Sequence, residues 1–300
     1  LRTRGEDGVW IHRVPLAGLE ARVEALEARD PAARAARAAM PLWGVPFSVK
    51  DCIDVAGVPT TAACPDYAYV PGTSNPGVQR LIDAGAIFVG KTNLDQFATG
   101  LVGTRTPYGI ARNPFDPAVI PGGSSSGAGV SVAAGLVSFA LGTDTGGSGR
   151  VPAAYTNTVG LKPTRGLIST RAMVPACRSL DCISVYALTV PDALAVLDAA
   201  AAPDPDQPYS RARAALAPDP WPGEAPLRIA VPGEADLDFL GDPVSETAFD
   251  EALAAFEAMG AEIARIDYAP FREVNAMMFQ GPMVAEREAV FGDFLRRAPE

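Results

Sequence analysis

Two glycine-rich runs in the middle of the chain constrain the fold more than any other feature. They read GGSSSGAG at residues 122–129 and GTDTGGSG at residues 142–149. Such a composition is typical of flexible linkers, but the intervening residues 130–141 are strongly apolar. We therefore predict that both runs are loops inside a folded core, where the backbone approaches another group closely.

Apolar segments with helical and extended patterns alternate along the chain. The predicted strands occupy residues 9–14, 44–50, 86–90, 137–141, 227–231 and 262–266. The predicted helices occupy residues 16–39 (with a break at Asp30 and Pro31), 78–84 and 242–259, the last capped by Asp242 and opened by Pro243. This alternation predicts an α/β fold with a largely parallel or mixed central sheet.

The chain length and a proline-rich stretch bear on domain organisation. The 300 residues suffice for one large or two ordinary domains. Residues 203–226 carry seven prolines and predict a long surface excursion, but strand and helix patterns resume beyond it. We therefore predict a single domain over residues 1–300, with no internal repeat.

The charge balance narrows the expected partners. Asp and Glu number 35 against 25 Lys and Arg, which gives a net charge of −10. Phosphate backbones and anionic lipid should repel such a chain, so neither nucleic acid nor membrane is expected as a partner. No apolar run approaches the ~20 residues of a membrane span, and the first fifteen residues have no secretory pattern. We expect a cytoplasmic protein.

The few cysteines and the single histidine argue against a zinc site and against a histidine as the catalytic base. The four cysteines include no C-x-x-C pair, and His12 is the single histidine. A zinc site would need closely spaced ligands that the sequence lacks, so neither a metal nor another cofactor is expected. His12 lies in a predicted strand and is read as a surface or packing residue. A hydrolase built on this sequence would need another base.

One motif favours nucleotide binding. Residues 85–92 read GAIFVGKT and satisfy the phosphate-loop pattern G-x-x-x-x-G-K-[ST]. The pattern works only where the residues between the glycines form a loop around a phosphate. Here those residues are AIFV, which favour a strand. Nucleotide binding through residues 85–92 stays open as an alternative from a different class of protein.

A lysine and two serines form a second candidate constellation. A serine hydroxyl is a poor nucleophile without a base, and a buried, neutral lysine can accept its proton. Lys50 ends an apolar strand, as a buried lysine would, and Ser124 and Ser148 lie in the two glycine-rich runs. The N–H groups of Thr145, Gly146 and Gly147 could stabilise an oxyanion beside Ser148. The alternative is that Ser148 only caps a helix over residues 149–157.

These segments resemble the amidase signature family. The resemblance rests on the two glycine-rich runs, on GLKPTR at residues 160–165, on GVPFSVKD at residues 44–51 and on GKTNLDQF at residues 90–97. It spans roughly residues 9–200 and implies a mixed, twisted central sheet covered by helices on both faces. It also implies a structural role for Lys91 in place of a phosphate contact.

The resemblance implies a role for each member of the Ser-Ser-Lys triad. Ser148 is expected to be the nucleophile, Ser124 the serine that follows a cis peptide bond, and Lys50 the base that acts through Ser124. Residues 145–147 are expected to hold the oxyanion with their backbone N–H groups. Amide hydrolysis would then proceed through an acyl-enzyme.

Three further segments most resemble allophanate hydrolases, which cleave urea-1-carboxylate and release ammonia. They are residues 93–105, 174–182 and 281–287. Arg287 is expected to bind the substrate carboxylate, and Gly122, Gly123 and Phe279 are expected to line the substrate site. The alternatives are an amidase for another small carboxylated amide and a catalytically silent relative that serves in a complex; a homodimer is a further expectation.

Four departures from the family pattern accompany this match. Cys52 replaces the usual asparagine, Gly146 stands where alanine is common, and Phe279 replaces a substrate-contacting tyrosine. Such amidases also continue beyond the position of Arg287, so a C-terminal truncation is expected.

Overall fold

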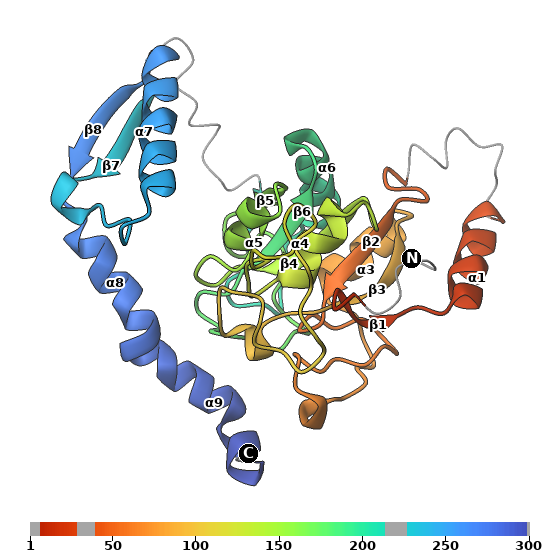
Figure 1. Ribbon diagram of the computed structural model, residues 1–300. Helices are drawn as coiled ribbons and strands as arrows, with labels where there is room; N and C mark the ends of the chain where they lie inside the picture. Colours follow the sequence, from red (N-terminus) through yellow and green to blue (C-terminus); the bar gives the residue numbers. More distant parts are fainter. Residues whose placement is uncertain (1–6, 29–39, 214–226, 299–300) are drawn as a thin grey trace. The chain divides into compact units, whose positions relative to one another are not determined.

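The computed structural model describes residues 7–28, 40–213 and 227–298. The chain divides into two compact units, which are treated separately below. The first comprises Leu1–Ala215 with Ala285–Glu300, and the second comprises Leu216–Val284 (Figure 1). The prediction of a single domain over residues 1–300 stays a prediction. The second half of the predicted helix over residues 16–39 and the end of the proline-rich stretch lie outside the described residues.

The described part of the first unit contains a six-stranded sheet in the order β1-β3-β2-β4-β6-β5. Its strands are β1 (Trp10–Arg13), β2 (Pro46–Lys50), β3 (Ile87–Thr92), β4 (Phe139–Thr143), β5 (Val159–Leu161) and β6 (Ile183–Ala187). β2 runs parallel to both β3 and β4, whereas β1, β6 and β5 pair antiparallel with their neighbours. The mixed α/β fold predicted from the sequence is confirmed.

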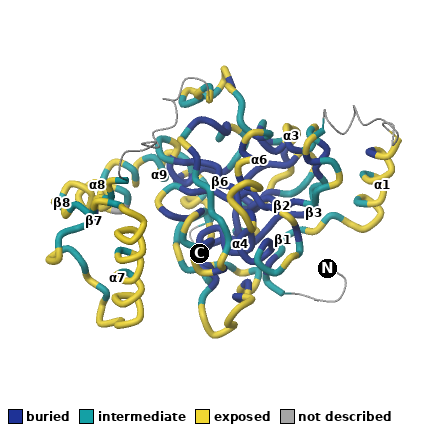
Figure 2. The backbone as a smooth tube through the Cα atoms, turned by 90° about the horizontal axis from the view of Figure 1, so that it is seen from above, coloured by how far each residue is buried: buried dark blue, intermediate teal, exposed yellow. Residues whose placement is uncertain are grey.

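Alternating side chains bury both faces of this sheet. Phe139 and Leu141 on β4 pack in the core cluster that includes α3 (Pro76–Asp83) and α6 (Val190–Ala200). Ala140 belongs to a separate cluster with α4 (Ser126–Ala133) and α5 (Arg150–Tyr155). Because successive side chains point to opposite faces of a strand, the two clusters mark the two faces. The central strands β2, β4 and β6 are buried in the first unit, whereas the edge strands β1 and β5 are only partly buried (Figure 2).

Local sequence determines where helix α3 begins. The Asn75 side chain accepts hydrogen bonds from the N–H groups of Gly77 and Val78, which caps α3 before Pro76 at its first turn.

A separate helix, α1 (Leu16–Glu27), follows β1. The last helix, α9 (Pro282–Arg297), enters the first unit from Ala285 onward.

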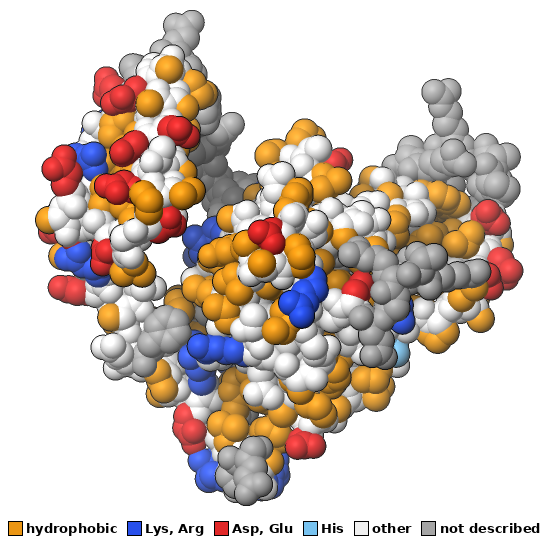
Figure 3. All heavy atoms as spheres, in the orientation of Figure 1, with side chains coloured by type: hydrophobic (Ala, Val, Ile, Leu, Met, Phe, Trp, Pro, Cys, Tyr) orange, Lys and Arg blue, Asp and Glu red, His pale blue; other side chains and the backbone are white. Residues whose placement is uncertain are grey.

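The second unit is a small β-α-β arrangement followed by a helix. β7 (Arg228–Pro232) and β8 (Glu262–Ile266) pair in parallel, and α7 (Pro243–Ala258) connects them. The Asp242 side chain accepts from the N–H of Val244, so the predicted cap of α7 is confirmed. Helix α8 (Ala269–Gln280) follows. Acidic side chains gather on the surface of this unit (Figure 3). No helix in the described part of the chain has the length and apolar composition needed to cross a membrane.

The phosphate-loop alternative is wrong, because its residues form a strand. Ile87–Thr92 is β3, which pairs with β1 on one side and β2 on the other. Its backbone N–H groups therefore serve the sheet and cannot wrap a phosphate. Lys91 is fully buried, with Nζ 3.2 Å from Asp51 Oδ1 and 2.9 Å from Thr60 Oγ1. The Asp51 carboxylate also accepts hydrogen bonds from the N–H and hydroxyl of Thr61.

Replacing Lys91 by methionine is expected to destabilise the fold. Removal of one partner from a buried ion pair leaves the other charge uncompensated, which costs about 3–5 kcal/mol. Urea denaturation of Lys91→Met should show this loss in the free energy of unfolding. The matched variant Lys162→Met alters a half-buried lysine whose amine, among the described residues, hydrogen-bonds only the adjacent Pro163 carbonyl, and it should cost less than about 1 kcal/mol. Unchanged stability in Lys91→Met would contradict a structural role for the pair.

Candidate active site

Lys50 occupies the last position of β2, and its side chain is fully buried. Its Nζ donates hydrogen bonds to Ser124 Oγ and to Thr143 Oγ1, both at 2.7 Å. Burial lowers the pKa of Lys50, because the charged form loses its hydration; the negative charges of Asp95, Asp181 and Asp144 offset part of this shift. The site therefore favours a neutral amine in direct contact with a serine hydroxyl.

Ser124 lies in a tightly packed turn before α4. The peptide bond between Gly123 and Ser124 is cis, as the resemblance implies. A Cβ atom on Gly123 would lie 2.0 Å from Asp95 Oδ2 and 2.5 Å from the backbone N of Gly103, so only glycine fits. The N–H of Asp95 donates to the Ser124 carbonyl at 3.0 Å. The close backbone approach predicted for this run is confirmed.

The Asp144 carboxylate organises the loop that carries Ser148. Its Oδ1 accepts from the N–H of Gly147 at 2.8 Å, and its Oδ2 accepts from the N–H of Gly149 at 3.1 Å. The Arg150 guanidinium binds both oxygens, at 2.9 and 3.0 Å. Although burial acts to raise it, these hydrogen bonds hold the pKa of Asp144 below its ordinary value. The carboxylate is therefore ionised near neutral pH and fixes the loop.

Ser148 sits at the end of this loop, in front of α5. Its carbonyl accepts from the Tyr186 hydroxyl at 3.0 Å, while its Oγ makes no hydrogen bond to another described residue. Ser148 retains 4% exposure, whereas Lys50 and Ser124 are fully buried. The N-cap of α5 is Gly149, without a side-chain cap, so the alternative that Ser148 merely caps this helix is wrong.

The loops of Ser124 and Ser148 pack against each other. A Cβ atom on Gly122 would lie 2.8 Å from Pro152 Cα, in the first turn of α5. In addition, the Ser125 hydroxyl donates to the carbonyl of Thr143, at the end of β4. The fold thus brings the lysine and both serine loops, which lie far apart in the sequence, to one place.

Backbone donors flank Ser148. The N–H groups of Thr145 and Gly146 make no hydrogen bond to another described residue. The N–H of Gly147, in contrast, is engaged by Asp144. The Thr145 hydroxyl donates to Asp181 Oδ1 at 2.5 Å. Thr145 and Gly146 are therefore the available donors of the predicted set.

The residues expected to bind substrate fall into both units. Arg287 lies on α9, where its Nε donates to the Ala176 carbonyl at 3.3 Å. Its neighbour Glu286 accepts from the N–H and hydroxyl of Ser179, at 2.9 and 2.5 Å. Phe279 belongs to α8 in the second unit, and its side chain lies outside the described part of the structure. Its predicted substrate contact stays a prediction.

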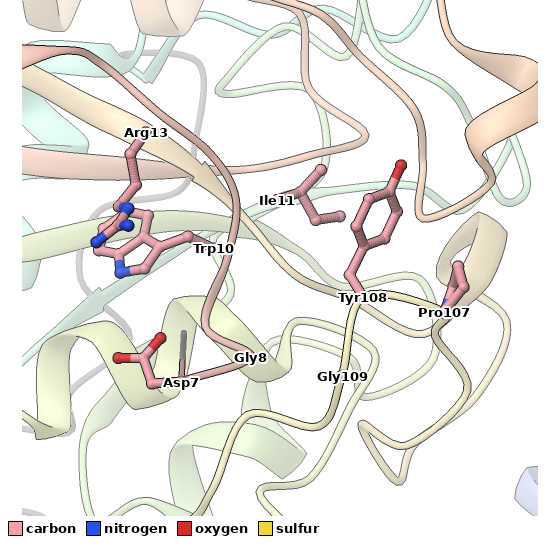
Figure 4. A pocket seen from close by; sticks show the side chains of 8 residues that line it. All are labelled: Asp7, Gly8, Trp10, Ile11, Arg13, Pro107, Tyr108 and Gly109. Atoms are coloured by element: carbon pink, nitrogen blue, oxygen red, sulfur yellow. The ribbon is translucent and has the colours of Figure 1, made fainter. Parts of the chain in front are cut away.

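A cavity of about 580 Å³ lies elsewhere, beside β1 (Figure 4). It is lined by Asp7, Gly8, Trp10, Ile11, Arg13, Pro107, Tyr108 and Gly109. None of the triad residues lines it, so it is not the site built around Ser148. Among the described residues, no cluster of three His, Cys, Asp or Glu side chains could hold a metal ion.

Several residues of the site have no assigned role in the sequence-based prediction. Thr143, Asp144 and Asp181 contact Lys50, the Ser148 loop and Thr145, respectively. Thr143 and Asp144 belong to the second glycine-rich run, so that motif carried a usable signal. Asp181 lies in the segment 174–182, which resembles allophanate hydrolases, but 36 residues separate it from Thr145, so no local pattern predicts their contact.

Fold and site together define an α/β protein with a buried Ser–Lys pair beside a glycine loop. The chain belongs to the amidase family, whose model matches residues 16–297.

Within this family, the chain is similar to individual curated relatives and solved structures. Urea amidolyase of Saccharomyces cerevisiae is 43% identical over 98% of this chain and 16% of its own length. A Kluyveromyces lactis allophanate hydrolase structure is 42% identical, with a TM-score of 0.89 over 98% of this chain and 47% of that one. A glutamyl-tRNA(Gln) amidotransferase structure from Thermotoga maritima is 34% identical, with a TM-score of 0.75 over 85% of this chain and 58% of that one. The chain thus spans less than half of the first two proteins.

Proposed function

We propose that this chain hydrolyses the amide bond of allophanate and releases ammonia. The observation that carries the proposal is the buried Lys50 amine, which lies 2.7 Å from Ser124 Oγ and 2.7 Å from Oγ1 of Thr143, the residue at which β4 ends and the loop to Ser148 begins. The names of the urea amidolyase and allophanate hydrolase relatives support the choice of substrate.

The proposed reaction uses Lys50, Ser124 and Ser148 as a proton relay. Ser124 passes its proton to neutral Lys50 and takes the proton of Ser148 as Ser148 Oγ attacks the amide carbonyl carbon. The N–H groups of Thr145 and Gly146 stabilise the oxyanion. The relay returns the proton to the amide nitrogen, the C–N bond breaks and ammonia leaves. Water then attacks the acyl-enzyme with the same relay, which restores Ser148.

The loop contacts of α9 support Arg287 as the group that binds the substrate carboxylate. Arg287 Nε contacts Ala176, and Asp181 lies farther along the same loop and accepts from the Thr145 hydroxyl. The segment that leads to Arg287 is therefore connected to the donors that would hold the oxyanion. A guanidinium suits this role, because it can bind a carboxylate through two parallel hydrogen bonds.

Replacing Arg287 by alanine is expected to raise KM for allophanate by about 10- to 150-fold, equivalent to about 1.5–3 kcal/mol for a charged hydrogen bond. The KM for neutral amides should rise far less, because they carry no carboxylate for Arg287 to bind. Ammonia release should be measured for allophanate, another small carboxylated amide and a neutral amide. Arg296→Ala is the matched control, because Arg296 lies on the same helix and pairs with Glu288 and Asp293.

Ammonia release from these three substrates separates a structural from a substrate-binding role of Arg287, and allophanate from another carboxylated amide as the substrate. Equal harm to neutral and anionic amides in Arg287→Ala would show that Arg287 is structural. Faster turnover of another carboxylated amide than of allophanate would favour that substrate and leave the amidase proposal intact. Ammonia release from none of the three would contradict the proposal itself. Substrate contacts of Gly122, Gly123 and Phe279, a homodimer and a cytoplasmic location stay predictions.

A further inference from the structure

Asp181 is a buried carboxylate between the Ser148 loop and helix α9. It lies just before β6 and is 1% exposed. Its Oδ1 accepts from the Thr145 hydroxyl at 2.5 Å and from the N–H of Cys177 at 3.1 Å. Its Oδ2 is buried and has no hydrogen-bond partner in the described part of the chain. Burying a carboxylate that is not fully hydrogen-bonded costs free energy.

The other side of the same loop is held by α9. The Glu286 carboxylate accepts from the N–H and hydroxyl of Ser179, and also from Cys177 Sγ at 3.2 Å. Arg287 Nε donates to Ala176. One hydrogen-bonded path therefore runs from α9 through residues 176–179 to Asp181, and from Asp181 to Thr145.

We propose that Asp181 is a positioning residue, which fixes the oxyanion-binding loop through Thr145 and links that loop to the helix that carries Arg287. This inference rests on the proposed function. Asp181 acts through Thr145, whose N–H is one of the two donors of the predicted oxyanion-binding set (residues 145–147) that make no hydrogen bond to another described residue.

The charge of Asp181 supplies an independent readout. Burial raises the pKa of Asp181 to about 6, although hydrogen bonds from the Thr145 hydroxyl and from the backbone N–H groups of Cys177 and Ala176, together with the charge of Lys50, act against this shift. Asp181 is therefore mostly ionised at neutral pH, and its negative charge in turn raises the pKa of Lys50. The carboxylates of Asp144 and Asp95 act on Lys50 in the same direction, whereas burial raises the pKa of the neighbouring Cys52 thiol and keeps it neutral. Removal of the Asp181 charge should let Lys50 lose its proton at lower pH.

Three variants separate the hydrogen bond from the charge. Asp181→Asn keeps an acceptor for Thr145 and Cys177 but removes the charge, so kcat should fall less than about 10-fold while the rise of kcat/KM moves to lower pH. Thr145→Val removes the hydroxyl donor and keeps the Asp181 charge, so kcat should fall about 100-fold, the scale of a misplaced catalytic loop, with an unmoved pH profile. Asp181→Ala should combine both effects.

Asp204→Asn is the matched control, because Asp204 is also buried and accepts from the hydroxyl of Ser169 and the guanidinium of Arg171. It should leave both kcat and the pH profile unchanged. Urea denaturation of each variant shows whether it folds.

Two assays keep this inference separate from the choice of substrate. Ammonia release from allophanate measures turnover, and the rate at which a fluorophosphonate probe labels Ser148 measures the serine alone. The same pH shift in labelling by Asp181→Asn would support the inference even where allophanate is not hydrolysed. An unmoved profile in Asp181→Asn, together with wild-type kcat in Thr145→Val, would overturn it and leave the proposed function standing.

Discussion

Ser148→Ala is expected to lose amide hydrolysis by about 10⁶-fold in kcat, the scale of removing a serine nucleophile from a hydrolase. The acyl-enzyme cannot form without Ser148 Oγ, and Ser124 cannot replace it, because Ser124 is fully buried against Lys50. Folding should be nearly unaffected. Ser148 Oγ makes no hydrogen bond to another described residue, so its removal leaves no buried partner unsatisfied.

The matched control for this prediction is Ser131→Ala. Ser131 is a buried serine on α4, and its hydroxyl bonds the Ala128 carbonyl and lies 3.0 Å from Ser48 Oγ. This variant should retain turnover, with at most a modest loss of stability. Ammonia release by both variants, with urea denaturation alongside, checks the contrast. Substantial turnover in Ser148→Ala, or an equal loss in Ser131→Ala, would contradict the role assigned to Ser148.

Lys50→Arg is expected to reduce kcat by about 10²–10⁴-fold, the range for loss of a general acid–base group. A guanidinium keeps its proton throughout the accessible pH range and cannot accept one from Ser124. Lys50→Met should be equally inactive; it removes the charge without adding bulk, which guards against a variant that fails to fold. Wild-type turnover in either folded variant would refute the relay.

The wild-type pH profile follows from the same residue. Because burial lowers the pKa of Lys50, the neutral fraction grows as pH rises through that lowered value. Activity should therefore increase with pH and level off above the pKa of Lys50. This rise with pH should be lost in Lys50→Met. The profile of kcat/KM against pH measures both outcomes.

Local sequence patterns were sufficient to predict several elements. The strand over residues 262–266 coincides with β8, and the cap at Asp242 with Pro243 begins α7 as expected. These features depend on short-range chemistry: a side chain that caps a helix, a proline in its first turn and an apolar run of strand length. Lys50 was placed at a strand end for the same reason, and β2 ends there.

Contacts across the sheet were beyond the reach of such patterns. The strand over residues 86–90 was predicted from its local sequence, but its pairing with β1 and β2, which rules out a phosphate loop over residues 85–92, was not. Thr143 reaches Lys50 because β4 lies beside β2, and Asp181 reaches Thr145 because β6 lies beside β4. Strand order is a tertiary property that periodicity does not encode.

The central claim is that Ser148 is a nucleophile activated through Lys50. Labelling with a fluorophosphonate probe, followed by peptide mapping, tests it most directly, because the probe reports the serine without reference to a substrate. We predict a single adduct on Ser148, formed faster as pH rises and lost in both Ser148→Ala and Lys50→Met. An adduct on another serine, or labelling that persists in Ser148→Ala, would contradict the claim.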